Sequence, residues 1–416
     1  MSSSIVIAFQ GHADIRASDP RSIEILDSDS YAARPGVIGY HAMFDPLQVA
    51  RARGRVRITI SCGQISDALE ATLSPLFVRG APLVLRRDPA ARAKSLAQAS
   101  SKAASDLHRD LIAALRGPDA SATLTITPLS DRAPSPGVLH LVAMPIGRQD
   151  DLSPRALDVL MSVDAIYAED TRIAQDNLSW RGVRTPLISC HEHSQKSRAG
   201  GVAERLKRGD RLAYVSDAGA PIVSDPGAAL VRAALDVGAI VTTAPGPSAV
   251  IAALSISGLA KGPFRFAGFA PRAGRERSVF LAEVAAGADT QILFESPHRL
   301  AALLSDLAAL APDRAAALCK DLTKQTESVS RAPLGQLSRD ITAETDVRGE
   351  YVLVLAGLEA VDGPPPDQGA DLDAFIRALI DAQCPTAPIV KAVRAVTGQD
   401  RTTAYARVAA LKERRD

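Results

Sequence analysis

The sequence of 416 residues predicts an α/β protein, and two observations carry that prediction. From Gly137 onward, short apolar runs alternate with segments of helical spacing, which is typical of a mostly parallel sheet. Stretches rich in turn-forming residues, at 130–137 and 361–369, separate this region from what precedes and follows it. We therefore expect four parts, at residues 1–130, 137–250, 251–360 and 370–416.

The composition excludes several classes of protein. Hydrophobic residues make up 46% of the chain, and the net charge of +1 gives no bulk attraction for nucleic acid. The four cysteines are widely scattered, which argues against a disulfide framework or a cysteine-based metal site. We see no signal peptide and no apolar run long enough to span a bilayer, so a cytoplasmic protein is expected.

The first part reads as a compact α/β domain. Strands are expected at 5–9, 55–61, 82–87 and 121–127, and the Ala-rich segment 90–115 has the spacing of one long helix. His12, with Arg86–Arg87, Lys102 and the His108–Arg109 pair, suggests an anion site. A surface histidine and a solvated helix face explain the same residues, and that interpretation is favoured.

The stretch 209–226 organises the central region. Leu212 to Val215 form an apolar run typical of a buried parallel strand, and the small residues of 216–221 follow it without a break. Loops at the carboxyl ends of strands are where open α/β sheets bind ligands. Asp225 and Pro226 then resemble an N-cap and first turn of a helix. An ordinary strand–turn–helix connection accounts for the pattern equally well.

Three further loops share this character, at 144–147, 245–249 and 295–299, and together the four can line one cleft. None is a dinucleotide-binding or P-loop motif, and no Ser-His-Asp elbow occurs. Cys190–His191–Glu192–His193 lacks a third ligand at suitable spacing, so no metal is expected. Glu169 to Arg172 supply acid/base carboxylates or, equally, the capped start of a helix.

Seven motifs, in order and spacing, resemble those of the 16S rRNA 2′-O-ribose cytidine methyltransferase family, within the tetrapyrrole methylase superfamily. They are VAMPIGR, AEDTR, ISCHEH, VSDAGAPIVSDPG, PGPSA, FESPHR and GEYVLVLAG. The resemblance covers residues 137 to about 358 and the helical tail. It implies S-adenosylmethionine bound between two α/β lobes, a homodimer, and a cytidine substrate in the decoding region of the small ribosomal subunit.

The resemblance also assigns roles. Cofactor-binding positions are Pro145, Gly147, Asp217, Gly219, Ala220, Pro221, Val223, Ser248 and Ala249. Candidates for the base that accepts the ribose hydroxyl proton are Glu169, Asp170, Glu295 and His298, which the sequence does not rank. Contacts to RNA are expected from Arg172, His191, His193, Lys196, Arg198, Arg272, Arg299 and Arg401. Met144, Arg148, Ala220 and Lys320–Asp321 depart from the residues usual in the family, and two cofactor-side hydroxyls are lost.

The two ends of the chain are less specific. The first domain resembles a small, mainly archaeal family of no settled activity, through residues 9–12, 37–45 and 86–109. Three short helices are expected at 372–380, 388–396 and 401–411, with helix-turn-helix spacing. From Asp371 on, eight basic residues face six acidic ones, so an RNA clamp and a simple helical bundle are equally favoured.

Two other functions compete with the methylation of ribosomal RNA. A tetrapyrrole methylase belongs to the same superfamily, but it needs neither FESPHR nor a basic tail. A non-catalytic S-adenosylmethionine- or RNA-binding protein would explain the lost hydroxyls, and the intact glycines and prolines of the cofactor loops argue against it.

Overall fold

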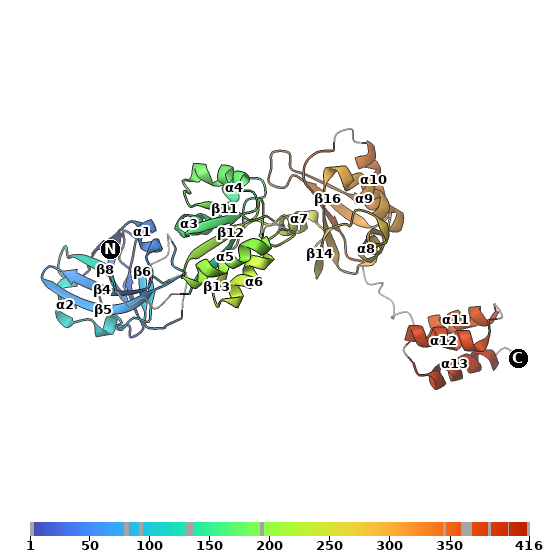
Figure 1. The fold of residues 1–416 in the computed structure, drawn as a ribbon, viewed down its shortest axis with the longest axis horizontal. Coiled ribbons are helices and arrows are strands. Elements are labelled where there is room, and N and C mark those ends of the chain that lie inside the picture. Colours follow the sequence, from blue (N-terminus) through green and yellow to red (C-terminus); the bar gives the residue numbers. More distant parts are fainter. Residues whose placement is uncertain are drawn as a thin grey trace. The chain divides into compact units, whose positions relative to one another are not determined.

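The structure, a computed structural model, describes residues 4–78, 83–90, 95–129, 136–191, 195–343, 347–358, 368–381, 384–397 and 399–413 (Figure 1). It divides into two compact units, Met1–Gly357 and Leu358–Asp416. The predicted α/β class is confirmed. Most of the two stretches expected to be linkers lies outside the described residues.

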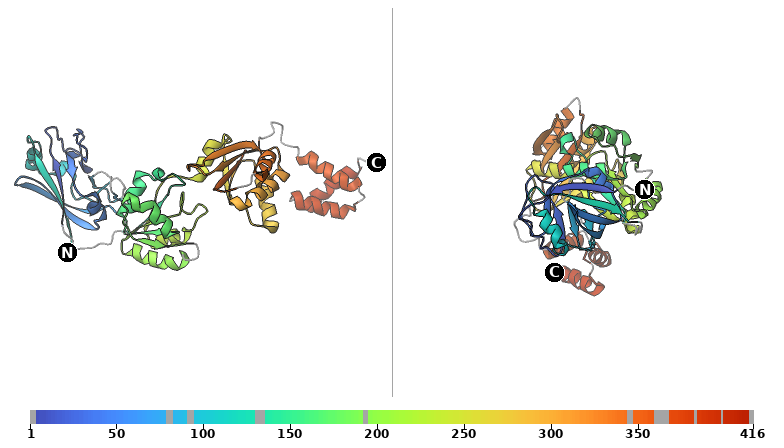
Figure 2. Two further views of the ribbon diagram at one scale, coloured as in Figure 1. Left: turned by 90° about the horizontal axis from the view of Figure 1, so that it is seen from above. Right: turned by 90° about the vertical axis from the view of Figure 1, so that its left-hand side faces the viewer.

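The first domain is a closed barrel with the strand order β1-β3-β2-β6-β7-β5-β4-β8, and Figure 2 shows the strands curving around one interior. Alternate residues of β4 point inward, with Val56, Ile58 and Ile60 fully buried. The strands are β1 (Ile5–Gln10), β2 (Ser22–Ile25), β3 (Val37–Met43), β4 (Arg55–Cys62), β5 (Ile65–Leu73), β6 (Leu83–Arg86), β7 (Ala97–Gln98) and β8 (Ser121–Pro128). The helices are α1 (Pro46–Arg51), η1 (Ala104–Asp106) and α2 (Arg109–Leu115).

The prediction of one long helix at 90–115 is wrong, because the described part of this segment has only the short turn η1 and, at its end, the helix α2. In its place the described part of the segment forms β7, which pairs with β5 and β6. Ala99 has a φ of 50°, which a right-handed helix excludes. The Ser101 hydroxyl accepts a hydrogen bond from the Glu70 amide at 2.9 Å, and the Ser101 amide donates to the Glu70 carbonyl at 2.8 Å, so long-range bonds hold this segment against β5. Burial in the barrel therefore overrides the helix propensity of alanine.

The expected cluster of cations in this domain is used internally. Arg87 is paired with Asp106 and Lys102 with Asp67. The Nε of Arg86 donates to the Ser95 hydroxyl at 2.9 Å. The anion-site hypothesis is therefore not favoured.

The part of the chain that follows the barrel contains a five-stranded sheet with the order β11-β10-β12-β9-β13. Every pairing in it is parallel, in agreement with the predicted mostly parallel sheet. Leu212 and Tyr214 of β12 face the helices α5 and α6, whereas Ala213 and Val215 face α3 and α4. The strands are β9 (Val138–Val142), β10 (Ala165–Ala168), β11 (Leu187–Ser189), β12 (Arg211–Val215) and β13 (Ile240–Ala244). The helices are η2 (Gln149–Asp151), α3 (Pro154–Ser162), α4 (Thr171–Leu178), η3 (Ser179–Arg181), α5 (Gln195–Lys207) and α6 (Ala228–Asp236). We call this part the first lobe.

The second lobe is a mixed sheet with the order β14-β15-β18-β16-β17. Its strands are β14 (Phe264–Phe269), β15 (Thr290–Glu295), β16 (Ala315–Lys320), β17 (Ser328–Pro333) and β18 (Tyr351–Leu355). Helices α8 (Gly274–Ala286), α9 (Pro297–Leu310) and α10 (Leu334–Ala343) cover one face, and α7 (Ala249–Ser257) covers the other. The antiparallel pair β15 and β18 sets Glu295 opposite Tyr351, so a strand end and a strand start meet at one edge.

The second unit contains the three predicted helices, α11 (Gln368–Asp381), α12 (Thr386–Thr397) and α13 (Arg401–Glu413). They pack side by side, as Figure 2 shows in red, around an apolar core that includes Ile376, Ile389 and Val408. The carboxylate of Asp400 accepts hydrogen bonds from the Thr402 and Thr403 backbone and so caps α13.

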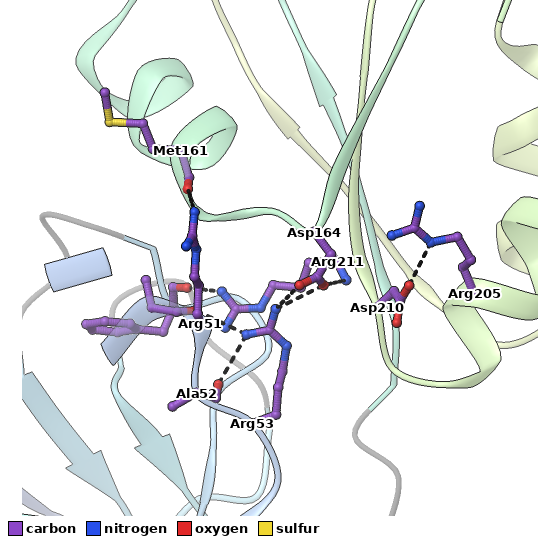
Figure 3. A network of polar contacts seen from close by, with 10 residues as sticks. Arg51, Ala52, Arg53, Met161, Asp164, Arg205, Asp210 and Arg211 are labelled. Atoms are coloured by element: carbon purple, nitrogen blue, oxygen red, sulfur yellow. Dashed lines mark hydrogen bonds and ion pairs between the residues drawn. The ribbon is translucent and has the colours of Figure 1, made fainter. Parts of the chain in front are cut away.

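A polar network joins the barrel to the first lobe (Figure 3). The guanidinium of Arg53 donates to both carboxylate oxygens of Asp164, at 3.0 and 3.1 Å. Asp164 also accepts from the Arg211 backbone at 2.7 Å. The buried Arg211 side chain donates to the Phe77 carbonyl at 2.6 Å, and Val78 packs in the apolar core of the lobe. The barrel is thus fixed at the edge of the sheet where β10 and β12 begin.

Because Asp164 accepts three hydrogen bonds in this network, its removal should destabilise the first unit. We expect Asp164→Ala to lower the free energy of unfolding by about 2 kcal/mol, the usual size for hydrogen bonds to a charged group. Asp236→Ala is the matched control, since Asp236 makes an exposed ion pair within α6, and it should change stability by less than about 0.5 kcal/mol. Denaturant unfolding measures both variants, and equal effects would contradict this account.

Candidate active site

A cavity of about 470 Å³ opens between the two lobes at the carboxyl ends of the first sheet. The first lobe contributes Ile146 after β9, Glu169 after β10, and residues 217–220 and 223–225 after β12. The start of α7 adds Ser248 to Val250. Of the four loops expected to line a cleft, those at 216–221, 245–249 and 295–299 line the cavity over part of their length. The loop at 144–147 contributes Ile146 alone.

Two backbone hydrogen bonds join the loops of the first lobe. The Met144 amide donates to the Gly219 carbonyl at 2.8 Å, and the Gly219 amide donates to the Met144 carbonyl at 3.0 Å. Gly219 has a φ of 70°, a conformation that favours glycine. Ile222 and Ser224 also have positive φ, at 76° and 64°, which is unusual for residues with side chains. The loop therefore holds its shape against local backbone strain, as binding loops often do.

The second lobe supplies the opposite wall of the cavity. Phe269 and Phe294 lie at strand ends with their rings 5.6 Å apart. Glu295 ends β15 with a nearly buried side chain, and one of its oxygens accepts from the Ser296 amide at 2.8 Å. Its other oxygen lies 3.2 Å from an Arg299 nitrogen. The Glu295 carboxylate is thus held at the rim of the sheet.

The pair Lys320–Asp321, which departs from the family pattern, has a structural role through Asp321. The Asp321 carboxylate accepts from the Glu350 amide at 3.0 Å and from the Thr326 hydroxyl at 2.7 Å. A Cβ at Gly349 would lie 2.6 Å from an Asp321 oxygen, so only glycine fits there. Asp321 therefore positions the segment that carries Glu350 to the cavity.

Gly147 joins the two lobes and does not line the cavity. A Cβ at Gly147 would lie 2.8 Å from the Leu322 carbonyl oxygen of the second lobe. The next amide, of Arg148, donates to the Thr323 hydroxyl at 2.9 Å. The absence of a side chain at Gly147 therefore allows the two lobes to approach at this point.

The cavity is acidic. Five carboxyl groups line it, and no lysine, arginine or histidine is among its described lining residues; the five are Glu169, Asp217, Asp225, Glu295 and Glu350. Burial raises the pKa of Asp217, and it raises that of Asp225 to about 6. Apolar side chains, among them Ile146, Val250 and Leu322, complete the lining. Such a site favours a ligand that has both a positive charge and an apolar part.

The structure brings most of the predicted cofactor residues together. Asp217, Gly219, Ala220, Val223, Ser248 and Ala249 line the cavity, whereas Pro145, Gly147 and Pro221 are outside its lining. Among the candidate bases, Glu169 and Glu295 line it, but Asp170 and His298 do not. Asp170 caps α4, and its bonds to the Arg172 side chain lower its pKa to about 2.

The predicted RNA-binding residues that the structure describes all lie outside the cavity lining. Arg172 is exposed and paired with Asp170, and Arg299 contacts Glu295 and the Ala270 carbonyl. The side chains of His191, Arg198, Arg272 and Arg401 are exposed, Arg401 in the second unit. Those of His193 and Lys196 lie outside the described residues.

Asp225 does not cap a helix as its sequence pattern predicts. Helix α6 starts at Ala228 with Gly227 at its N-cap, and Asp225 lines the cavity. Gly227 has a φ of 124°, and a Cβ there would lie 2.5 Å from the Tyr214 ring. The turn at Gly227 therefore delays the helix and leaves Asp225 in the loop. The sequence signal that could have placed Asp225 in the cavity is a carboxylate within a run of small residues.

Residues 138–338 match the family of Tetrapyrrole (Corrin/Porphyrin) Methylases. A ribosomal RNA small subunit methyltransferase I from Micromonospora olivasterospora is 37% identical over 304 residues, which are 72% of this chain and 95% of that protein. One from Xylella fastidiosa is 40% identical over 273 residues, or 65% and 98% of the two chains. The chain belongs to the ribosomal RNA small subunit methyltransferase I family.

Solved structures of tetrapyrrole methylases are more distant from this family member. Cobalt precorrin-4 methyltransferase is 16% identical with a TM-score of 0.42, and the match covers 53% of this chain and 94% of that one. Uroporphyrin-III C-methyltransferase from Thermus thermophilus, complexed with S-adenosyl homocysteine, is 18% identical with a TM-score of 0.38, covering 53% and 96%. The predicted kinship of the barrel with an archaeal family stays a prediction.

The raised pKa of Asp225 predicts a stabilising substitution. Burial moves this pKa from 3.8 to about 6, so ionised Asp225 destabilises the folded protein above about pH 6. We expect Asp225→Asn to raise the melting temperature at pH 8, and the gain to shrink as the pH falls through 6 toward 4. Thermal unfolding at several pH values measures this, with the exposed Asp236→Asn as control. A lower melting temperature at pH 8 would contradict the argument.

Proposed function

We propose that the cavity between the lobes binds S-adenosylmethionine and that the protein methylates the ribose 2′-hydroxyl of a cytidine in 16S rRNA. Membership of the methyltransferase family supports the reaction. The single observation that carries the site is its five carboxyl groups beside an apolar lining. S-adenosylmethionine contains a sulfonium, an ammonium and one carboxylate, so it has a net positive charge, and the flat faces of its aromatic adenine ring pack against apolar side chains. The lining complements both features.

The residues of this cavity suggest how the reaction proceeds. S-adenosylmethionine supplies, when bound, a methyl group activated by its sulfonium. Asp217, Gly219, Ala220, Val223, Ser248 and Ala249 would hold it, with Pro145, Gly147 and Pro221 shaping the loops around them. The main task of the protein is to align the ribose hydroxyl with this methyl group, and alignment lowers the barrier by several kcal/mol.

Glu295 is our preferred base for the hydroxyl proton. One of its oxygens is fixed by the Ser296 amide, and the other makes no hydrogen bond among the described residues. That second oxygen lies 3.2 Å from an Arg299 nitrogen, so it can accept a proton without losing a hydrogen bond but at the expense of this ion pair. Glu169, which also lines the cavity, is the second candidate. Asp170 is disfavoured, since its low pKa makes it a weak base.

We further propose a homodimer that acts in the cytoplasm on the decoding region of the small ribosomal subunit. These details come from the motifs shared with the family. Among the described helices, none is long and apolar enough to cross a membrane. The alternative of a tetrapyrrole substrate is not favoured, because the relatives that cover most of this chain are named as ribosomal RNA methyltransferases.

Transfer of a labelled methyl group tests the proposal. The protein is incubated with methyl-labelled S-adenosylmethionine and small ribosomal subunits from cells that lack the endogenous enzyme. We expect label in one alkali-resistant dinucleotide, because 2′-O-methylation blocks alkaline cleavage of the next phosphodiester. Label on a base, or no label in RNA while the cofactor still binds, would contradict the proposal.

The same assay tests the base. Glu295→Gln should lower kcat at saturating cofactor by about 10²-fold or more, the usual contribution of general base catalysis, which exceeds the effect of losing one cavity charge on cofactor affinity. Glu276→Gln, which changes an exposed glutamate on α8, should behave as the wild type. Full activity of Glu295→Gln would transfer the role to Glu169.

A further inference from the structure

Trp180 is the single tryptophan of the chain, and it lies on the surface of the first lobe with 59% of its area exposed. It sits in η3, the turn that follows α4. Isolated exposed apolar residues are common on protein surfaces. The contacts around Trp180 are what distinguish it.

The indole of Trp180 rests on a fixed cation. The Arg181 guanidinium lies 4.3 Å from the centre of the ring. Its position is held by the Gln149 carbonyl at 2.6 Å and by Asp150 at 3.3 Å. Arg181 itself is mostly buried, so Trp180 covers a preorganised support while most of the indole remains open.

One further cation lies close to Trp180 in the sequence. Residues 171–186 contain three arginines, of which Arg172 is paired with Asp170 and Arg181 with Asp150. Arg184, four positions after Trp180, is exposed and lines a hollow of about 370 Å³ together with Ser179. The cavity between the lobes has no cation among its described lining residues, so RNA phosphates require cations outside it.

The turn around Trp180 is tied to the loops of the cavity. Arg181 and Asn177 both bond to Gln149, the first residue of η2, which follows the 144–147 loop. At its other end, α4 begins directly after Glu169 and Asp170. A ligand that stacks on Trp180 would therefore contact the same segments that shape the cavity.

We propose that Trp180, supported by Arg181, is a stacking platform for an unpaired base of the RNA substrate, with Arg184 contacting a phosphate beside it. The inference rests on the proposed function, because the substrate class is taken from it. Recognition of single-stranded RNA typically combines stacking on aromatic rings with cations for the backbone. A protein partner would instead favour an apolar surface with few like charges.

Because Trp180 is the only tryptophan, its fluorescence reports on this surface alone. The full-length protein is titrated with a 12-nucleotide single-stranded RNA that contains cytidines and carries a fluorescent end label. We expect saturable quenching of the tryptophan emission, with the same midpoint as the anisotropy of the label. Binding by anisotropy with unchanged tryptophan emission would overturn the proposal, and so would failure to bind this RNA.

Variants separate stacking from folding. Trp180→Leu should weaken RNA binding about 10-fold, whereas Trp180→Phe should retain most of it, since a ring still stacks. Arg184→Ala should weaken binding and reduce its salt dependence. Leu235→Ala, at another exposed apolar residue, is the control and should bind RNA as the wild type does. Equal binding by Trp180→Leu and the wild type would overturn the proposal.

The assay also separates this inference from the proposed function. In methyl transfer, Trp180→Leu should raise the KM for RNA and leave kcat and cofactor affinity unchanged. Quenching by RNA in a protein that methylates no ribosomal RNA would leave the platform standing and refute the reaction. Tryptophan emission that changes with protein concentration alone, with a smaller mass for Trp180→Leu, would assign the surface to a second copy of the chain and overturn the proposal.

Discussion

The desolvated carboxylates between the two lobes are the feature on which the rest of this structure depends. Burial raises the pKa values of Asp217 and Asp225, so holding these groups in place costs the empty protein stability. The positive φ angles of Ile222 and Ser224 in the same loop add backbone strain. A positively charged ligand that binds here would offset the cost of burying the carboxylates, and the strained backbone holds the loop in the shape that faces the ligand.

Hydrogen bonds and close contacts hold the loops in this conformation despite these costs. The paired hydrogen bonds of Met144 and Gly219 join two loops of the first lobe. Gly147 lets that lobe approach the second, and Asp321 fixes the segment that carries Glu350. No basic residue is among the described lining of the cavity, and exposed arginines such as Arg184 lie outside it. The charge separation suits a protein that would bind a cationic cofactor and a polyanionic substrate at once.

The sequence predicted the parts of this arrangement that depend on local pattern. The apolar run 212–215 correctly located β12, and the loops predicted at 144–147 and 295–299 lie at the ends of β9 and β15. The barrel was not foreseen, because β7 is built from an Ala-rich segment whose helix propensity is overridden by burial. Asp225 was misassigned, since the delay of α6 depends on the contact of Gly227 with the Tyr214 ring, which is distant in sequence. The ion pairs of Asp170 and Arg299 depend on side-chain geometry that residue types do not specify.

Calorimetric titration with S-adenosylmethionine tests most directly whether the carboxylates between the lobes bind a cationic cofactor. We expect one site per chain and an affinity that decreases as the pH falls through about 6, where Asp225 becomes protonated. We also expect about 10-fold weaker binding by Asp217→Asn, the effect of losing one favourable charge interaction. Absence of binding, or equal affinity of Asp217→Asn and the wild type across this pH range, would contradict these expectations.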